Sequence, residues 1–128
     1  MTSHPPSSNE SAGVWPTSLS YNKDLRFLQV EFESGETFDL PAEYLRVESP
    51  SAEIQGHNGA KVIIGGRRHV GIINIEQVGN YAVRITFDDL HDTGIYSWKI
   101  LYELAINRKD RWSTYLADLV TKGLTRDP

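Results

Sequence analysis

The segment IINIEQVGNYAVRITF, residues 72–87, carries the clearest structural pattern in the chain. Two runs rich in β-forming residues flank Gly79-Asn80, a dipeptide typical of two-residue hairpin loops. The residues that fall on one face of its second half are Tyr81, Val83, Ile85 and Phe87. The segment therefore predicts an antiparallel hairpin with one face toward a core.

Shorter strands are predicted on the N-terminal side of this hairpin. Apolar and polar residues alternate there, and turn-forming residues separate the runs. Pro41 favours the first turn of a short helix, where its missing N–H needs no partner. The predicted elements are strands over 17–21, 28–32 and 37–40, a helix over 41–46, and a weaker strand over 61–64.

Two helices are predicted on the C-terminal side. Ser97 can cap the first, and the second runs from Asn107 to Gly123. The apolar stripe of the second helix consists of Trp112, Tyr115, Leu116, Leu119 and Val120. Strands first and helices last predict an α+β fold, in which an antiparallel sheet built from hairpins carries the C-terminal helices on one face.

The aromatic residues of this C-terminal region have two interpretations. At helical spacing they are expected to be core anchors, because each buries a large area. The alternative is a platform for a partner. These residues are Tyr96, Trp98, Tyr102, Trp112 and Tyr115.

The chain of 128 residues has the length of one domain, which we place over residues 14–124. Residues 1–13 contain no large apolar side chain after Met1, so they are expected to form a disordered tail.

Composition excludes several classes of function. Thirteen basic residues against seventeen acidic ones give a net charge of −4, which disfavours nucleic-acid binding. The absence of cysteine excludes disulfides, thiolate metal sites and thiol nucleophiles. Long apolar runs and common catalytic motifs are also absent, so we expect a cytoplasmic protein that is neither a membrane protein nor an enzyme.

Two polar clusters are candidate sites. His91 lies among Asp88, Asp89 and Asp92, where it could bind a divalent metal or move a proton. The alternative is an exposed loop between a strand and a helix.

The second cluster surrounds Gly65-Gly66 and consists of Lys61, Arg67, Arg68 and His69. Glycines let the backbone approach an anion, so this loop could hold a phosphate or carboxylate. The alternative is a solvated hairpin tip.

Two stretches resemble a known family. They are YLR (44–46) followed by SPSAE (49–53), and FDDLHDTGIYSW (87–98). Over residues 17–106 the chain resembles the domain at the N-terminus of gamma-butyrobetaine hydroxylase and trimethyllysine dioxygenase, and most closely its stand-alone bacterial members. The resemblance implies the fold, but the oxygenase domain of those enzymes is a separate domain. Fusions of the family's domain to Mrp-type carrier ATPases imply a setting in iron–sulfur handling.

In the hydroxylases this domain holds a structural zinc through three cysteines and a histidine. The resemblance places the cysteine positions on Ser49, Ser51 and Ile54, and the histidine position on His91. Hydroxyls and an isoleucine cannot replace thiolates, so no zinc and no other cofactor is expected. We expect His91 instead to form a hydrogen bond that ties the loop after Phe87 to the loop after Arg46.

The sequence leaves two hypotheses for function. The first is a non-catalytic interaction or adaptor module that binds another protein, in the setting of iron–sulfur or metal handling. The second is a small-molecule or metal-ion-binding protein that uses the 55–59 and 65–69 loops and His91. For a metal the weaker candidates are His91, His57 and Asp92, and for a ligand or partner surface they are Arg67, Arg68, His69 and Tyr96.

Overall fold

The hairpin predicted over residues 72–87 is present in the structure, a computed structural model that describes residues 15–50 and 62–128. Strand β4 (Ile72–Val78) pairs antiparallel with β5 (Ala82–Phe87). Val78 lies opposite Ala82, so the loop contains three residues rather than two. Tyr81 belongs to this loop and is 54% exposed, so its predicted place on the apolar face is wrong.

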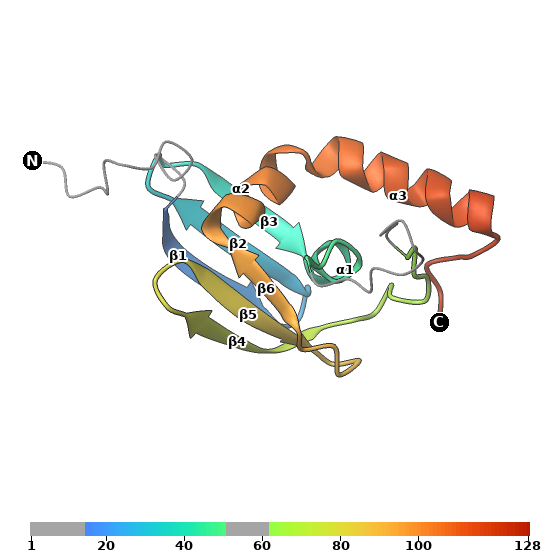
Figure 1. The fold of residues 1–128 in the computed structure, drawn as a ribbon, viewed down its shortest axis with the longest axis horizontal. Coiled ribbons are helices and arrows are strands. Elements are labelled where there is room, and N and C mark those ends of the chain that lie inside the picture. Colours follow the sequence, from blue (N-terminus) through green and yellow to red (C-terminus); the bar gives the residue numbers. More distant parts are fainter. Residues whose placement is uncertain (1–14, 51–61) are drawn as a thin grey trace, which may run out of the picture.

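Strand β6 (Gly94–Ser97) completes this sheet, and Tyr96 lies opposite Val83 of β5. The sequence predicts no strand over these residues, because a strand of four residues is too short to show alternation. The other sheet has the order β1 (Pro16–Asn22), β2 (Phe27–Phe32) and β3 (Thr37–Pro41). The α+β class is confirmed, and the strands of the described residues form two three-stranded antiparallel sheets (Figure 1).

Both C-terminal helices are present. Helix α2 (Trp98–Ile106) begins at Ser97, whose Oγ accepts a hydrogen bond from the amide of Ile100 at 3.1 Å. Helix α3 (Arg108–Lys122) ends at Gly123, whose φ of +70° is a left-handed conformation that favours glycine. Helix α2 packs against β3 and β6, whereas α3 extends away from the sheets and over α1 (Figure 1).

One large apolar cluster joins the two sheets to α1 and α2. Its most deeply buried side chains include Leu28, Val30, Phe32, Leu40, Leu45, Ile85, Phe87 and Leu101. A smaller cluster under α3 consists of Val47, Tyr115 and Leu119, with Ile63, Ile64 and Trp112 packed against it. Trp98 and Trp112 are only partly buried, so they anchor the edge of the core rather than its centre.

Helix α1 (Ala42–Val47) is short, and all six of its residues are buried. A helix of this length is unstable in isolation, so tertiary contacts must hold it. The hydroxyl of Tyr44 donates to the carbonyl of Leu104 in α2 at 2.6 Å. Burial raises the pKa of Tyr44 to about 12, so the phenol remains a donor throughout the physiological range.

Residues 125–127, which we call the C-terminal strap, return from α3 to the 65–68 segment. The amide of Gly66 donates to the carbonyl of Thr125, and the amide of Arg68 donates to that of Arg126. A Cβ atom at Gly65 would lie 2.4 Å from the carbonyl oxygen of Thr125, so this approach requires glycine. Contacts with the rest of the domain therefore continue past residue 124, where the sequence places its end.

Arg126 connects the strap to α1. Its Nε and Nη2 donate to the two carboxylate oxygens of Glu43 at 2.8 and 2.7 Å, and its guanidinium lies 5.2 Å from the ring centroid of Trp112. The Glu43 side chain is only 7% exposed. A buried carboxylate of this kind needs its partner, because an unpaired buried charge is costly.

The predicted disordered tail and the 55–59 loop lie outside the described residues. The part of the predicted 61–64 strand that is described, residues 62–64, forms no strand. No helix among residues 15–50 and 62–128 is long and apolar enough to cross a membrane.

We predict that Arg126→Ala lowers the free energy of unfolding by about 2–4 kcal/mol, because it leaves the Glu43 carboxylate buried without its partner. Arg68→Ala is the matched control, because it breaks the exposed ion pair with Asp127 in the same strap. It should cost less than about 1 kcal/mol. Urea unfolding of both variants measures the difference, and equal losses would contradict the assigned role of Arg126.

Candidate functional site

The predicted hydrogen bond of His91 is present. Its Nε2 lies 3.0 Å from the Oγ of Ser49, and both side chains are buried. Ser49 follows α1 and His91 follows β5, so the bond ties these two loops together. This prediction is confirmed, and it shows that two ligand positions of the resembled zinc site lie side by side.

Tyr96 is fully buried next to this pair. Its hydroxyl donates to the carbonyl of Leu45 at 2.5 Å and also hydrogen-bonds to Ser49. Burial raises the pKa of the Tyr96 phenol above its usual range. A Cβ atom at Gly94 would lie 2.6 Å from the Ser49 Oγ, so glycine is needed there. The prediction of Tyr96 as a ligand or partner surface is wrong, because its place on β6 turns it into the core.

Asp89 forms ion pairs with two arginines. Its Oδ2 lies 2.8 Å from Nε of Arg46 and 2.7 Å from Nε of Arg67, and its Oδ1 accepts a hydrogen bond from the amide of His91. The contact with Arg67 is an ion pair rather than an aligned hydrogen bond. Burial raises the pKa of Asp89, but the His91 amide and the arginines outweigh it and hold the pKa below its usual range.

The 65–69 cluster offers little free positive charge. Arg67 pairs with Asp89 and Arg68 with Asp127, while His69 is exposed. A small cavity of about 190 Å³ lies beside Arg67 and His69, but Asp88 and Asp89 also line it. Carboxylates on the wall oppose an anion, so the geometry does not favour the predicted phosphate or carboxylate site.

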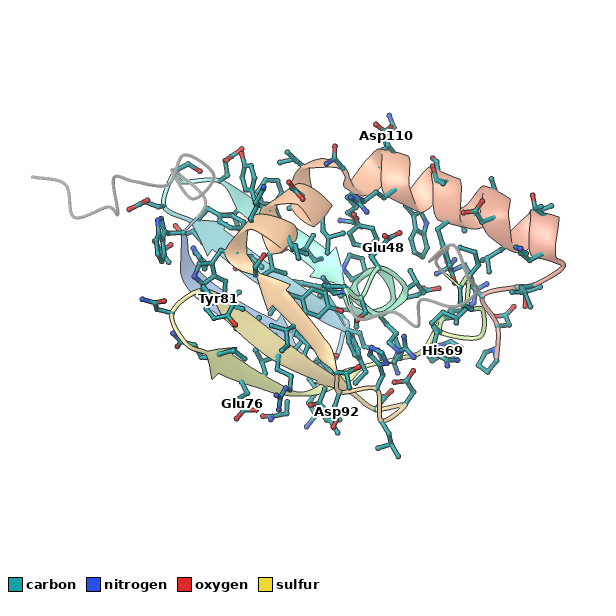
Figure 2. All side chains as sticks on the ribbon, viewed as in Figure 1. Glu48, His69, Glu76, Tyr81, Asp92 and Asp110 are labelled. Carbon is teal, nitrogen blue, oxygen red and sulfur yellow. The ribbon has the colours of Figure 1, made fainter. Side chains whose placement is uncertain are left out.

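The metal candidates do not converge in the described residues. His91 is buried, whereas Asp92 is exposed in a depression lined with Arg84, Thr93 and Ile95. Figure 2 also shows Asp92 on a loop apart from His69, a candidate of the anion site. His57, Ser51 and Ile54 lie outside the described residues. Within residues 15–50 and 62–128, no three His, Cys, Asp or Glu side chains form a group that could hold a metal ion.

The described donors also fit a zinc ion poorly. Ser49 and His91 hydrogen-bond to each other, whereas two ligands of one ion would both face that ion. A Ser–His pair at this distance could in principle form a nucleophile and its base. Ser49, however, is 2% exposed, and neither residue lines a cavity described for the domain, so the geometry favours a structural role.

The segment that contains α1, β6 and the His91 loop matches a known family. Residues 19–102 match the family model described as gamma-butyrobetaine hydroxylase-like, N-terminal. The chain belongs to this family. No curated protein is significantly similar to it.

Solved structures support this family assignment. Two solution NMR structures share 43% and 44% sequence identity with the chain, at TM-scores of 0.78 and 0.80. The first similarity covers 89% of this chain and 90% of the other, and the second covers 99% and 92%. A crystal structure of a protein with unknown function, a DUF971 family member from Acidithiobacillus ferrooxidans, is 34% identical with a TM-score of 0.62. That similarity covers 72% of this chain and 93% of the other.

Helix α3 lies beyond the region that matches the gamma-butyrobetaine hydroxylase-like model. Tyr115 and Leu119 of the predicted apolar stripe are buried, but Leu116 is 37% exposed and Val120 is 80% exposed. Only part of the apolar stripe of α3 therefore packs against the core. The sequence shows the stripe, but it does not show that α3 extends away from the sheets, so that within residues 15–50 and 62–128 Leu116 and Val120 stay exposed.

The exposed half of the stripe continues into the junction of α2 and α3. A depression of about 520 Å³ lies there, lined by Ala105, Ile106, Arg108, Lys109, Trp112 and Ser113. Ile106 is 52% exposed. We call Ile106, Trp112, Leu116 and Val120 the outer α3 face.

We predict that Ser49→Ala and His91→Ala each lower the free energy of unfolding by about 1–2 kcal/mol, because each removes a hydrogen bond from a buried polar side chain. The loss of unfolding free energy in the double variant should be about 1 kcal/mol smaller than the sum of the losses in the two single variants. Chemical unfolding of the wild type and the three variants measures these losses. A metal chelator is expected to leave the Tm unchanged. A stoichiometric metal whose removal lowers the Tm would contradict the structural role of His91.

The lowered pKa of Asp89 predicts a pH-dependent contribution to stability. Asp89→Asn should cost about 1–3 kcal/mol at neutral pH, because Arg46 and Arg67 lose their carboxylate. Since the folded-state pKa lies below the unfolded-state value near 3.9, this contribution is complete above about pH 5 and is lost as the pH falls below about 4.

Unfolding measured from pH 7 to pH 2 tests this pH dependence. The stability gap between the wild type and Asp89→Asn should narrow at low pH. Asp92→Asn, at an exposed carboxylate of the same loop, serves as the control and should give a small gap at every pH. A gap for Asp89→Asn that stays constant down to pH 2 would rule out the assigned ion pairs.

Proposed function

We propose that this domain is a non-catalytic protein-interaction module that binds its partner through the outer α3 face. The observation that carries the proposal is the exposure of large apolar side chains in one continuous stripe, from Ile106 at 52% to Val120 at 80%. Contiguous apolar surface of this kind marks interaction sites, because leaving it in water is unfavourable.

The internal use of the polar candidates supports an interaction role over chemistry. His91 is bonded to Ser49, Arg67 pairs with Asp89, and Tyr96 donates to a backbone carbonyl. Each of these side chains stabilises the fold. Within the outer α3 face, Trp112 also packs against the core, whereas Ile106, Leu116 and Val120 belong to neither apolar cluster of the described residues.

Family resemblance adds a setting to the proposal. Fusions of related domains to iron–sulfur carrier ATPases point to a partner in iron–sulfur or metal handling, in the cytoplasm. The net charge of −4 disfavours nucleic acid as that partner.

A Val120→Asp variant is expected to lose the partner. A charge placed in an apolar interface costs about 2 kcal/mol or more, which corresponds to about thirtyfold weaker binding. Thr121→Asp is the matched control, because it introduces the same residue at the next position, about 100° around the helix and outside the outer α3 face. Both positions are exposed, so both variants should melt like the wild type.

The measurement is affinity capture from the source cell with the three proteins in parallel, followed by titration with the purified partner. A protein retained by the wild type and Thr121→Asp but lost by Val120→Asp supports the proposal. If every captured protein is retained equally by all three, the outer α3 face is not the binding surface.

A further inference from the structure

Two cations lie at one end of the outer α3 face. Arg108 and Lys109 line the depression at the α2–α3 junction, together with the apolar side chains of Ile106 and Trp112. Arg108 Nη1 donates to the backbone carbonyl of Asp39 at 2.7 Å. Among the described residues, neither cation forms an ion pair with a carboxylate.

The two ends of the outer α3 face therefore differ in charge. From Lys109 to Val120 it spans about 16 Å at the rise of 1.5 Å per residue, which is three helical turns. One end is apolar and basic, and the other end is apolar. Apolar residues four apart along this span, Trp112, Leu116 and Val120, lie on one side of the helix.

From this geometry, and resting on the proposed function, we infer that the partner presents an amphipathic helix whose acidic residues lie at the end that covers the α2–α3 junction. The apolar stripe would pack against Leu116 and Val120, while carboxylates would meet Lys109 and Arg108. Opposite charges at such a rim fix the register of the two helices and suppress the reversed arrangement.

A second copy of the chain fits this face less well. In a symmetric antiparallel pair of α3 helices centred on Leu116, Lys109 would face Gly123 and Arg108 would face Leu124. Neither residue carries a carboxylate, so both cations would lose water without gaining a partner. Charge complementarity therefore selects a different, acidic partner.

Two synthetic helical peptides test the inference. They share one leucine stripe with the spacing of the outer α3 face and differ only at one end, where one carries glutamates and the other lysines. We expect the glutamate peptide to shift the NMR amide signals of Lys109, Leu116 and Val120, and to bind at least about fivefold more tightly than the lysine peptide.

Charge reversal on α3 separates the local effect from net charge. Lys109→Glu should abolish or invert the preference for the glutamate peptide. Lys122→Glu is the matched control, because it makes the same change on the same helix but on the side away from the outer α3 face, and it should leave the preference intact.

Three outcomes would overturn the inference. Equal binding of both peptides would be consistent with docking on the apolar face but would contradict an acidic partner. Failure of both peptides to bind would remove the amphipathic helix as the occupant, and concentration-dependent shifts without peptide would replace it with a second copy. The capture experiment with Val120→Asp tests the proposed function separately, so a failure of the acidic-helix inference can be told apart from a failure of the outer α3 face as a binding surface.

Discussion

Helix α1 is the element on which the other parts of the domain depend. Four consecutive residues, Glu43 to Arg46, each bond to a different distant segment: the C-terminal strap, α2, β6 and the loop after β5. The helix has too few turns to be stable alone, and its burial leaves no water to satisfy its polar groups. Each contact is therefore required by α1 and at the same time positions the segment that provides it.

The contacts of α1 explain the structural roles of the polar residues that the sequence analysis singles out. In the sequence, His91 and Asp89 belong to a polar cluster that could carry chemistry, and Tyr96 is a candidate for a ligand or partner surface. In the fold they face α1 and the residues that follow it, where they act as hydrogen-bond and ion-pair partners. On the part of the chain that the structure describes, Leu116 and Val120 of α3 are apolar side chains left exposed.

Strong local patterns made much of the fold predictable. The β4–β5 hairpin, the Ser97 cap and the glycine that ends α3 each follow from residues close together in the chain. Strand β6 and the C-terminal strap were missed, because one is too short to show a period and the other depends on Glu43, 83 positions away. The Ser49–His91 bond was predictable only because family resemblance brought two distant positions together. The exposure of Val120 was not, because periodicity gives the width of an apolar stripe but not what covers it.

The pairing of Glu43 with Arg126 has a consequence for synthesis on the ribosome. Residues 43–46 are made early, but their partners emerge 43 to 83 residues later. The β1–β2 and β4–β5 hairpins can form as they are synthesised, since their contacts are local. Helix α1, in contrast, is not stabilised until β6, α2 and finally the strap have been synthesised. During that interval α1 lacks some of its partners and the nascent chain exposes apolar surface. Folding of the domain therefore cannot be completed until Arg126 has been synthesised.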